Sequence, residues 1–124
     1  MRLLLDTHVF LWWCENSRQL RKPVRLAIQE AESVFVSAAS AWEVALKVAL
    51  RKLRIPGPFA DAVLSSSFDE LPITFAHATA VSSLPMHHTD PFDRMLAAQA
   101  QVEGLTLVTH DRQLEAYAVP ILWT

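Results

Sequence analysis

The sequence predicts a three-layer α/β/α fold with a mostly parallel central sheet. Short apolar runs alternate along the 124 residues with longer segments of helical periodicity, and such alternation is typical of the βα units that build parallel sheets. The strand-like runs are apolar almost throughout, as expected for strands that helices cover on both faces. No repeat or linker interrupts this pattern, so residues 1–124 are predicted to form one domain.

Five segments are expected to be strands. The first is the apolar run 2–5, which ends abruptly at Asp6. The second is Val34-Phe35-Val36, because β-branched and aromatic residues favour strands. Three further short runs complete the expected sheet, at 71–74, 105–109 and 119–123.

The segments between the strands have helical patterns. The first helix is expected over 8–14, with Thr7 available as its N-cap, and a basic amphipathic helix follows around 26–31. The third is rich in Ala and Leu and is expected to begin at Ser37 and continue to about Leu53. Further helices are expected at 59–68, 76–84, 91–102 and 112–117.

The composition excludes several classes of protein. With 52% hydrophobic and 19% charged residues, the chain is not intrinsically disordered. Asp6 interrupts the amino-terminal apolar run too early for a signal peptide, and no apolar run is long enough to cross a bilayer. A single cysteine fits a reducing compartment, so a cytoplasmic protein is expected. The apolar surplus in so short a chain favours an oligomer.

The basic residues are concentrated although the net charge is −2. Eight of the 11 lie in two stretches, Arg18, Arg21, Lys22, Arg25 and Lys47, Arg51, Lys52, Arg54. Each stretch fits a solvated helix face, and the first is also a candidate for contacts with nucleic-acid phosphates.

The acidic residues have ordinary structural explanations when taken singly. Asp6 could cap the helix that follows the first strand. Glu43 could form a capping box with Ser40 or an ion pair with Lys47. In Asp90-Pro91-Phe92-Asp93, the first acid reads as an N-cap and the second as a first-turn acid. Asp111 could begin the last short helix.

Their common placement points to a catalytic site instead. In a parallel sheet all carboxyl ends lie at one edge, where ligands bind. That edge would gather mutually repelling carboxylates that a cation must neutralise, and oxygen ligands select Mg²⁺ or Mn²⁺. Such an ion suits phosphodiester hydrolysis, because it polarises the phosphate and activates water. The candidate catalytic acids are Asp6, Glu43, Asp93 and Asp111, with Asp90 close by.

Other kinds of site do not fit the sequence. Two glycines cannot form a Walker loop or a dinucleotide fingerprint, and the five histidines lack zinc-site spacing. His87-His88 is expected to support the Asp90 loop or contact substrate, with a metal-ligand role the less favoured alternative. The four tryptophans stand in apolar runs and are expected in the core.

Several segments together resemble the PIN-domain toxins, most closely the VapC type of bacterial toxin–antitoxin systems. The similarity extends from Arg2 to Trp123. It is carried by Leu3-Leu4-Leu5-Asp6-Thr7-His8, Ser37-Ala38-Ala39-Ser40-Ala41-Trp42-Glu43-Val44, Leu71-Pro72-Ile73-Thr74, the stretch from His88 through Asp90-Pro91-Phe92-Asp93-Arg94 to Ala100, and Leu105-Thr106-Leu107-Val108-Thr109-His110-Asp111.

This resemblance implies a Mg²⁺- or Mn²⁺-dependent endoribonuclease that cleaves RNA, forms a homodimer and is neutralised by a small antitoxin. The family's first, second and last acids fall on Asp6, Glu43 and Asp111. The third falls on Asp90 or Asp93, and Asp93 is favoured because it directly precedes the helical stretch that begins at Arg94. Asp6, Glu43, Asp93 and Asp111 are then the implied metal ligands.

Three alternatives remain open at this point. A phospho-acceptor domain also has an acidic pocket, but Asp6 has no acidic neighbour and no lysine follows Lys52. A solitary PIN-like nuclease in RNA processing would have the same acids without an antitoxin. A non-catalytic α/β interaction domain would have no need of the complete acid set.

Overall fold

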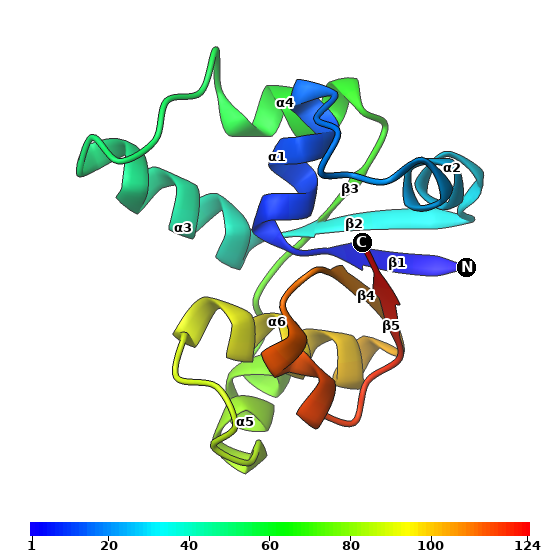
Figure 1. Cartoon of the computed structure of the whole chain (residues 1–124). Helices are drawn as coiled ribbons and strands as arrows, with labels where there is room; N and C mark the ends of the chain where they lie inside the picture. Colours follow the sequence, from blue (N-terminus) through cyan, green and yellow to red (C-terminus); the bar gives the residue numbers. More distant parts are fainter.

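The structure, a computed structural model, describes residues 1–124 and contains one five-stranded sheet with the order β3-β2-β1-β4-β5 (Figure 1). All four strand pairs are parallel, which confirms the predicted sheet. The strands are β1 (Arg2–Leu5), β2 (Ser33–Ser37), β3 (Asp69–Leu71), β4 (Thr106–Thr109) and β5 (Ile121–Trp123).

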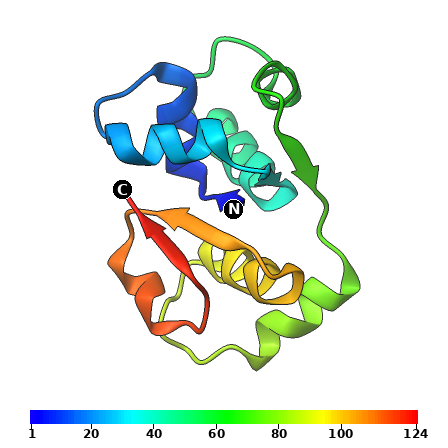
Figure 2. The same cartoon turned by 90° about the vertical axis from the view of Figure 1, so that its right-hand side faces the viewer.

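Helices cover both faces of this sheet, as the predicted three layers require (Figure 2). One face is covered by α1 (Thr7–Glu15), α2 (Lys22–Glu30) and α4 (Phe59–Ser65). The other is covered by α5 (Phe75–Ser83), α6 (Pro91–Glu103) and the 3-10 helix η1 (Arg112–Ala116). The remaining helix, α3 (Ala38–Ala49), follows β2 and packs on both α1 and α6.

The sheet separates two apolar cores. Successive side chains of a strand point to opposite faces, so Leu3 and Leu5 lie in the core beneath α1 and α2, and Leu4 lies in the core beneath α6. All three leucines are fully buried. This explains why β1 is apolar at consecutive positions: as the central strand it has no solvent-facing side.

The strand order places the topological switch point, where the chain turns from one half of the sheet to the other, at β1. From β1 the chain proceeds through β2 to β3 on one side, and β4 and β5 lie on the other. Open α/β sheets bind ligands at this switch point, outside the carboxyl ends of the strands. Asp6 follows β1 there, and its backbone N–H donates to the Val108 carbonyl of β4 at 3.0 Å.

Buried polar contacts fix the start of α3 beside this point. The Ser37 hydroxyl caps α3 by accepting from Ala39 N–H at 2.9 Å, and it donates to the Gln99 side chain of α6. The Thr7 hydroxyl of α1 donates to Ser40 Oγ at 2.9 Å. These bonds tie α3 to the helices on either side, so Glu43 is held at a defined place in the middle of α3.

Several boundaries differ from those predicted: α2 begins at Lys22 instead of about 26, α4 ends at Ser65 instead of 68, and β5 begins at Ile121 instead of 119. The N-cap of α1 is Asp6 and not Thr7, which is the first helical residue. Helix α3 ends at Ala49 instead of Leu53, because Arg51 adopts a left-handed conformation with φ 59°. That turn contains no glycine, so its position could not be predicted from the residue types.

The third strand occupies 69–71 instead of the predicted 71–74. Pro72 has no N–H for a further sheet bond, and Thr74 already serves as the N-cap of α5. Thr74 and His77 form a reciprocal capping box there.

The prediction that all four tryptophans lie in the core is wrong. Trp12, Trp13 and Trp123 are half-buried, whereas Trp42 is 58% exposed and stacks on Phe92 with ring centroids 5.1 Å apart. The apolar surplus is therefore partly at the surface. No helix has the length and apolar character needed to cross a bilayer.

Candidate active site

A polar pocket of about 390 Å³ opens at the carboxyl ends of β1 and β4. None of its 11 lining residues is hydrophobic. All five acids predicted from the sequence line it, together with two potential cations and three histidines: Asp6, Glu43, Asp90, Asp93, Asp111, Lys47, Arg112, His8, His88 and His110, with Thr7 as the remaining member. The sequence-based expectation that the acids gather at one sheet edge is confirmed.

Asp6 is the most deeply buried of these acids, at 3% exposed. One carboxylate oxygen accepts from Val9 N–H at 2.8 Å, which caps α1, and the other accepts from the Thr109 hydroxyl of β4. Burial raises the pKa of Asp6, and these two hydrogen bonds oppose the rise. Each oxygen retains a lone pair for a further partner.

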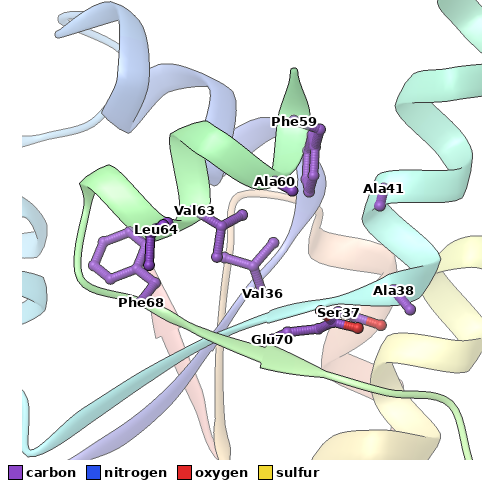
Figure 3. A pocket seen from close by; sticks show the side chains of 10 residues that line it. All are labelled: Val36, Ser37, Ala38, Ala41, Phe59, Ala60, Val63, Leu64, Phe68 and Glu70. Atoms are coloured by element: carbon purple, nitrogen blue, oxygen red, sulfur yellow. The ribbon is translucent and has the colours of Figure 1, made fainter. Parts of the chain in front are cut away.

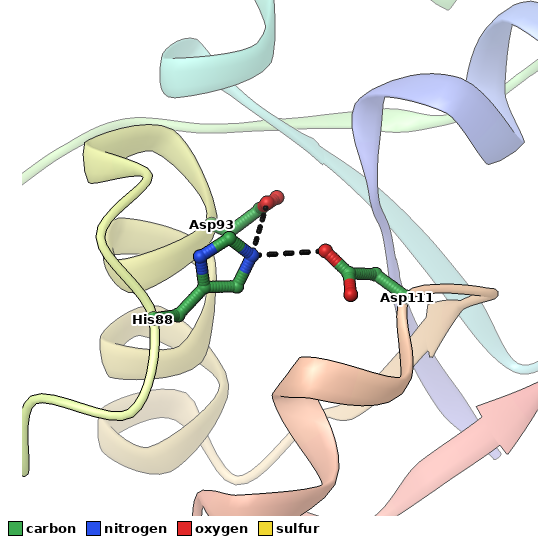
Figure 4. A group of neighbouring side chains, drawn as sticks. All are labelled: His88, Asp93 and Asp111. Carbon is green, nitrogen blue, oxygen red and sulfur yellow. Dashed lines mark hydrogen bonds and ion pairs between the residues drawn. The ribbon is translucent and has the colours of Figure 1, made fainter.

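His88 lies between Asp93 and Asp111 (Figure 4). Its Nε2 is 3.1 Å from Asp93 Oδ2 and 2.9 Å from Asp111 Oδ2. One potential ligand atom from each residue falls within a 4.8 Å group. The two carboxylates thus converge from the first turn of α6 and from the residue before η1.

The hydrogen bond at the other ring nitrogen of His88, Nδ1, indicates which nitrogen carries the proton. Nδ1 accepts from Asp90 N–H at 3.2 Å, so the neutral ring carries its proton on Nε2 and donates it to the carboxylates. An Nε2 that carries a proton cannot also ligate a metal. His88 therefore orients Asp93 and Asp111, and the expectation that it supports the Asp90 loop is confirmed.

Asp90 has its own structural task. Its Oδ1 accepts from Phe92 N–H at 2.8 Å and from Asp93 N–H at 3.2 Å, which makes it the N-cap of α6, as predicted. Asp93 lies one turn into the helix with its carboxylate directed at the pocket, in contact with His88.

Glu43 is buried at 6% exposed, and Lys47 Nζ pairs with its Oε2 at 2.8 Å. The predicted ion pair is confirmed, and the alternative capping box with Ser40 is wrong because Ser37 caps α3. The Lys47 side chain is 39% exposed and lines the pocket, so solvent reaches this ion pair from one side.

Asp93 has a raised pKa, as Asp6 does. Burial, together with the charges of Asp90 and Asp6, raises its pKa to about 7 in the absence of metal. Asp111 differs: burial would raise its pKa, but hydrogen bonds from His88 and Gln113 N–H outweigh that effect and the pKa is lowered. Crowding and burial thus favour protonation of Asp93 in the absence of metal, and a bound cation would favour its carboxylate form.

Not every predicted residue reaches the pocket. Arg18, Arg21, Lys22 and Arg25 do not line it. Arg21 donates to the Trp123 carbonyl at 2.9 Å, and the Arg25 guanidinium lies 5.4 Å from the centre of the Trp13 ring. Sequence reasoning missed Thr109, which holds Asp6, and also Arg112. The available signal for Thr109 was its hydroxyl at the end of an apolar strand, two residues before Asp111.

Two apolar pockets lie outside the acidic one. The first, of about 450 Å³, lies between α3, α4 and β2 and is lined chiefly by Val36, Ala41, Phe59, Val63 and Phe68 (Figure 3). The second, of about 460 Å³, lies between α3, α5 and α6 and is bordered by the exposed Trp42 and Met86.

The ionisation of Asp93 predicts how stability depends on pH without metal. Its folded pKa lies above its unfolded value of 3.8, so the native state binds more protons, and the free energy of unfolding falls as pH rises from about 4 to about 7. Asp93→Asn should remove the part of this fall that Asp93 causes and be more stable than wild type at pH 8, by a few kcal/mol as an order of magnitude. Urea unfolding in EDTA from pH 5 to pH 8 measures the free energy of unfolding of both proteins.

The exposed Asp69→Asn variant is the matched control and should follow the wild-type profile. The raised pKa of Asp93 would be contradicted if the wild-type free energy of unfolding stayed constant or rose over this range and Asp93→Asn were no more stable than wild type at pH 8.

Comparison with known proteins agrees with this geometry. A family model for the PIN domain matches residues 3–120. Ribonuclease VapC22 of Mycobacterium tuberculosis is 31% identical over 121 residues, covering 95% of this chain and 93% of that protein. Among solved structures, VapBC2 from Rickettsia felis bound to a promoter DNA fragment matches with a TM-score of 0.69 at 12% identity, covering 98% of each chain.

FitAcB from Neisseria gonorrhoeae matches with a TM-score of 0.67 at 23% identity, covering 97% of this chain and 96% of that one. These likenesses cover nearly the whole chain, and both the family model and the relative extend across the acids of the pocket. The chain therefore belongs to the PIN-domain family and is a ribonuclease of the VapC toxin type.

Proposed function

We propose that residues 1–124 form a single nuclease domain that cleaves RNA with Mg²⁺ or Mn²⁺ and acts as the toxin of a toxin–antitoxin pair in the cytoplasm. One observation carries the proposal: the buried Asp6 and Glu43 share one pocket with Asp93 and Asp111. Such crowding of acids destabilises the fold unless a cation neutralises it.

The metal ligands we propose are Asp6, Glu43, Asp93 and Asp111. All are carboxylates, which suit a hard cation better than zinc. Asp90 is assigned to capping α6, because both N–H groups that it accepts belong to that helix. When bound, the cation would polarise the scissile phosphate and activate the attacking water.

The chain's own residues prepare this chemistry. Thr109 and Val9 N–H hold Asp6, and His88 holds Asp93 and Asp111. Arg112 lines the pocket with its guanidinium stacked 4.2 Å from the centre of the Trp123 ring, which restricts its motion. Arg112 and Lys47 are the cations available to phosphate groups at the pocket.

A wider contact of RNA with Arg18, Arg21, Lys22 and Arg25 remains a proposal. Arg21 bonds to the carbonyl of Trp123, at the end of the strand beside β4, so the amino-terminal end of α2 lies on the pocket's edge of the sheet. Because the net charge is −2, these residues would supply positive potential that the acidic pocket lacks. Arg25 is the weakest member, since it packs on Trp13.

The partners proposed are a second copy of the chain and a small antitoxin. Structures of VapBC and FitAB toxin–antitoxin complexes share this fold. For the second copy, the exposed Trp42 and the pocket beside it offer an apolar face next to Glu43. For the antitoxin, the apolar pocket between α3 and α4 could hold a hydrophobic segment.

The first functional test is metal-dependent cleavage. Purified protein should cut RNA with Mg²⁺ or Mn²⁺ and stop when EDTA is added. Asp6→Asn should slow cleavage by at least about 100-fold, on the order of 3 kcal/mol of transition-state stabilisation, while circular dichroism shows an intact fold.

Asp69→Asn, an exposed acid away from the pocket, should cut at the wild-type rate. Cleavage by Asp6→Asn at the wild-type rate in metal-free buffer would refute the mechanism. Absence of RNA cleavage with intact folding would favour the non-catalytic interaction domain.

A second functional test concerns partners. Light scattering of the Asp6→Asn protein should give about twice the 13.9 kDa monomer mass, and adding Trp42→Glu should give the monomer, because a charge is costly in an apolar interface. The gene should adjoin a short one whose product binds the toxin and prevents growth arrest. A monomeric, harmless wild-type protein without such a neighbour would favour a solitary PIN-like nuclease in RNA processing.

A further inference from the structure

Two aromatic rings that line the acidic pocket, those of His8 and His110, lie against a third ring, that of Trp12. His8 and Trp12 are one turn apart on α1, and His110 lies in the loop after β4. The Trp12 and His110 ring centroids are 4.7 Å apart, those of His8 and His110 are 5.8 Å apart, and those of His8 and Trp12 are 6.1 Å apart. We call these three residues the ring wall.

The ring wall is not explained by core packing. His8 and His110 are exposed and line the pocket, while Trp12 is half-buried, with part of its ring packed on the apolar core beneath α1. None of the three side chains forms a hydrogen bond to another protein group in the structure. The half-buried indole thus lies beside two exposed imidazoles, at interplanar angles of 35° to His8 and 55° to His110, and the imidazole nitrogens remain free for a ligand.

The position of the ring wall beside the carboxylates indicates what kind of ligand it would bind. His8 is two residues after Asp6, and His110 is directly before Asp111, so the rings adjoin the carboxylates that would bind the metal and the scissile phosphate. In a nucleotide chain the group next to a phosphate is a ribose with its base. Bases stack on aromatic rings regardless of sequence because every base has a π face.

We propose that His8, Trp12 and His110 form a nucleobase-stacking subsite, which holds the base of the nucleotide adjoining the cleaved phosphate. This inference rests on the proposed RNA cleavage. Stacking there would fix the phosphate against Asp6 and Asp111, so the ring wall positions the substrate and takes no part in bond breaking. It would also make the enzyme prefer an unstacked, single-stranded segment, because a paired base cannot reach the wall.

Abasic substitution tests the subsite directly. A short labelled RNA that the wild-type protein cuts at one place is made abasic at each position in turn, and binding is measured by fluorescence anisotropy in the Asp6→Asn background. One abasic position beside the cut should weaken binding by about tenfold. In Trp12→Ala the intact RNA should bind about as weakly, and the abasic change should then have almost no further effect.

Further variants separate stacking from folding and charge. Trp12→Phe and His110→Phe keep a ring and should retain sensitivity to the abasic change, whereas His110→Ala should lose part of it. His8→Ala and His110→Ala remove exposed rings, so they serve if Trp12→Ala fails to fold. Phe75→Ala, which removes a ring that is 94% exposed on α5, is the control and should behave as wild type.

The outcomes distinguish the subsite from the proposed function. If the wild-type protein cuts no RNA, the proposed function fails. If it cuts RNA but the abasic profile is the same in wild type, Trp12→Ala and His110→Ala, the subsite alone is overturned. Weaker antitoxin binding by these variants, with an unchanged RNA profile, would also overturn it and assign the ring wall to the protein partner.

Discussion

Repulsion among carboxylates is the constraint on which the rest of this site depends. Five acids line one pocket at the carboxyl ends of β1 and β4, and the two most affected by burial, Asp6 and Asp93, have raised pKa values. Isolated, such groups would favour opening of the pocket. The fold keeps them in place because a central strand with three fully buried leucines and three helix starts position their backbones.

Helix N-termini are the means by which the fold tolerates this charge. Asp6, Asp90 and Asp111 are each the N-cap of the helix that follows, so each carboxylate accepts backbone N–H groups at the positive end of a helix. Capping uses only part of a carboxylate's capacity as an acceptor. Each of these acids can therefore cap a helix and still bind a metal ion. From the sequence alone these two roles looked like alternatives.

The sequence predicted most of the fold and the acids of the site. Apolar strands, the proline that begins α6 (Pro91) and the glycine that ends it (Gly104) are local signals, so the order of the elements was predicted correctly. Because the strands are parallel, Asp6 and Asp111 were expected at the same edge of the sheet. The predictions that failed concerned a backbone turn at a residue type that rarely makes one and a surface contact between distant residues. The left-handed turn at Arg51 and the exposure of Trp42 have no local signal.

The same limit applies inside the site. That His88 sits between Asp93 and Asp111, or that Thr109 reaches Asp6, depends on side chains from different elements meeting across the pocket. The RNA contacts of the basic stretch at 18–25 are not decided by spacing either, since Arg21 and Arg25 already have intramolecular partners.

Proton release on metal binding tests the central claim most directly. With its pKa at about 7, Asp93 is mostly protonated at pH 6.5, and ligation requires the carboxylate. Calorimetric titration with Mn²⁺ in two buffers of different protonation enthalpy should show release of most of one proton per ion at pH 6.5, little at pH 8.5, and little at either pH for Asp93→Asn. Binding of Mn²⁺ at pH 6.5 without proton release, or with equal release from Asp93→Asn, would contradict the account.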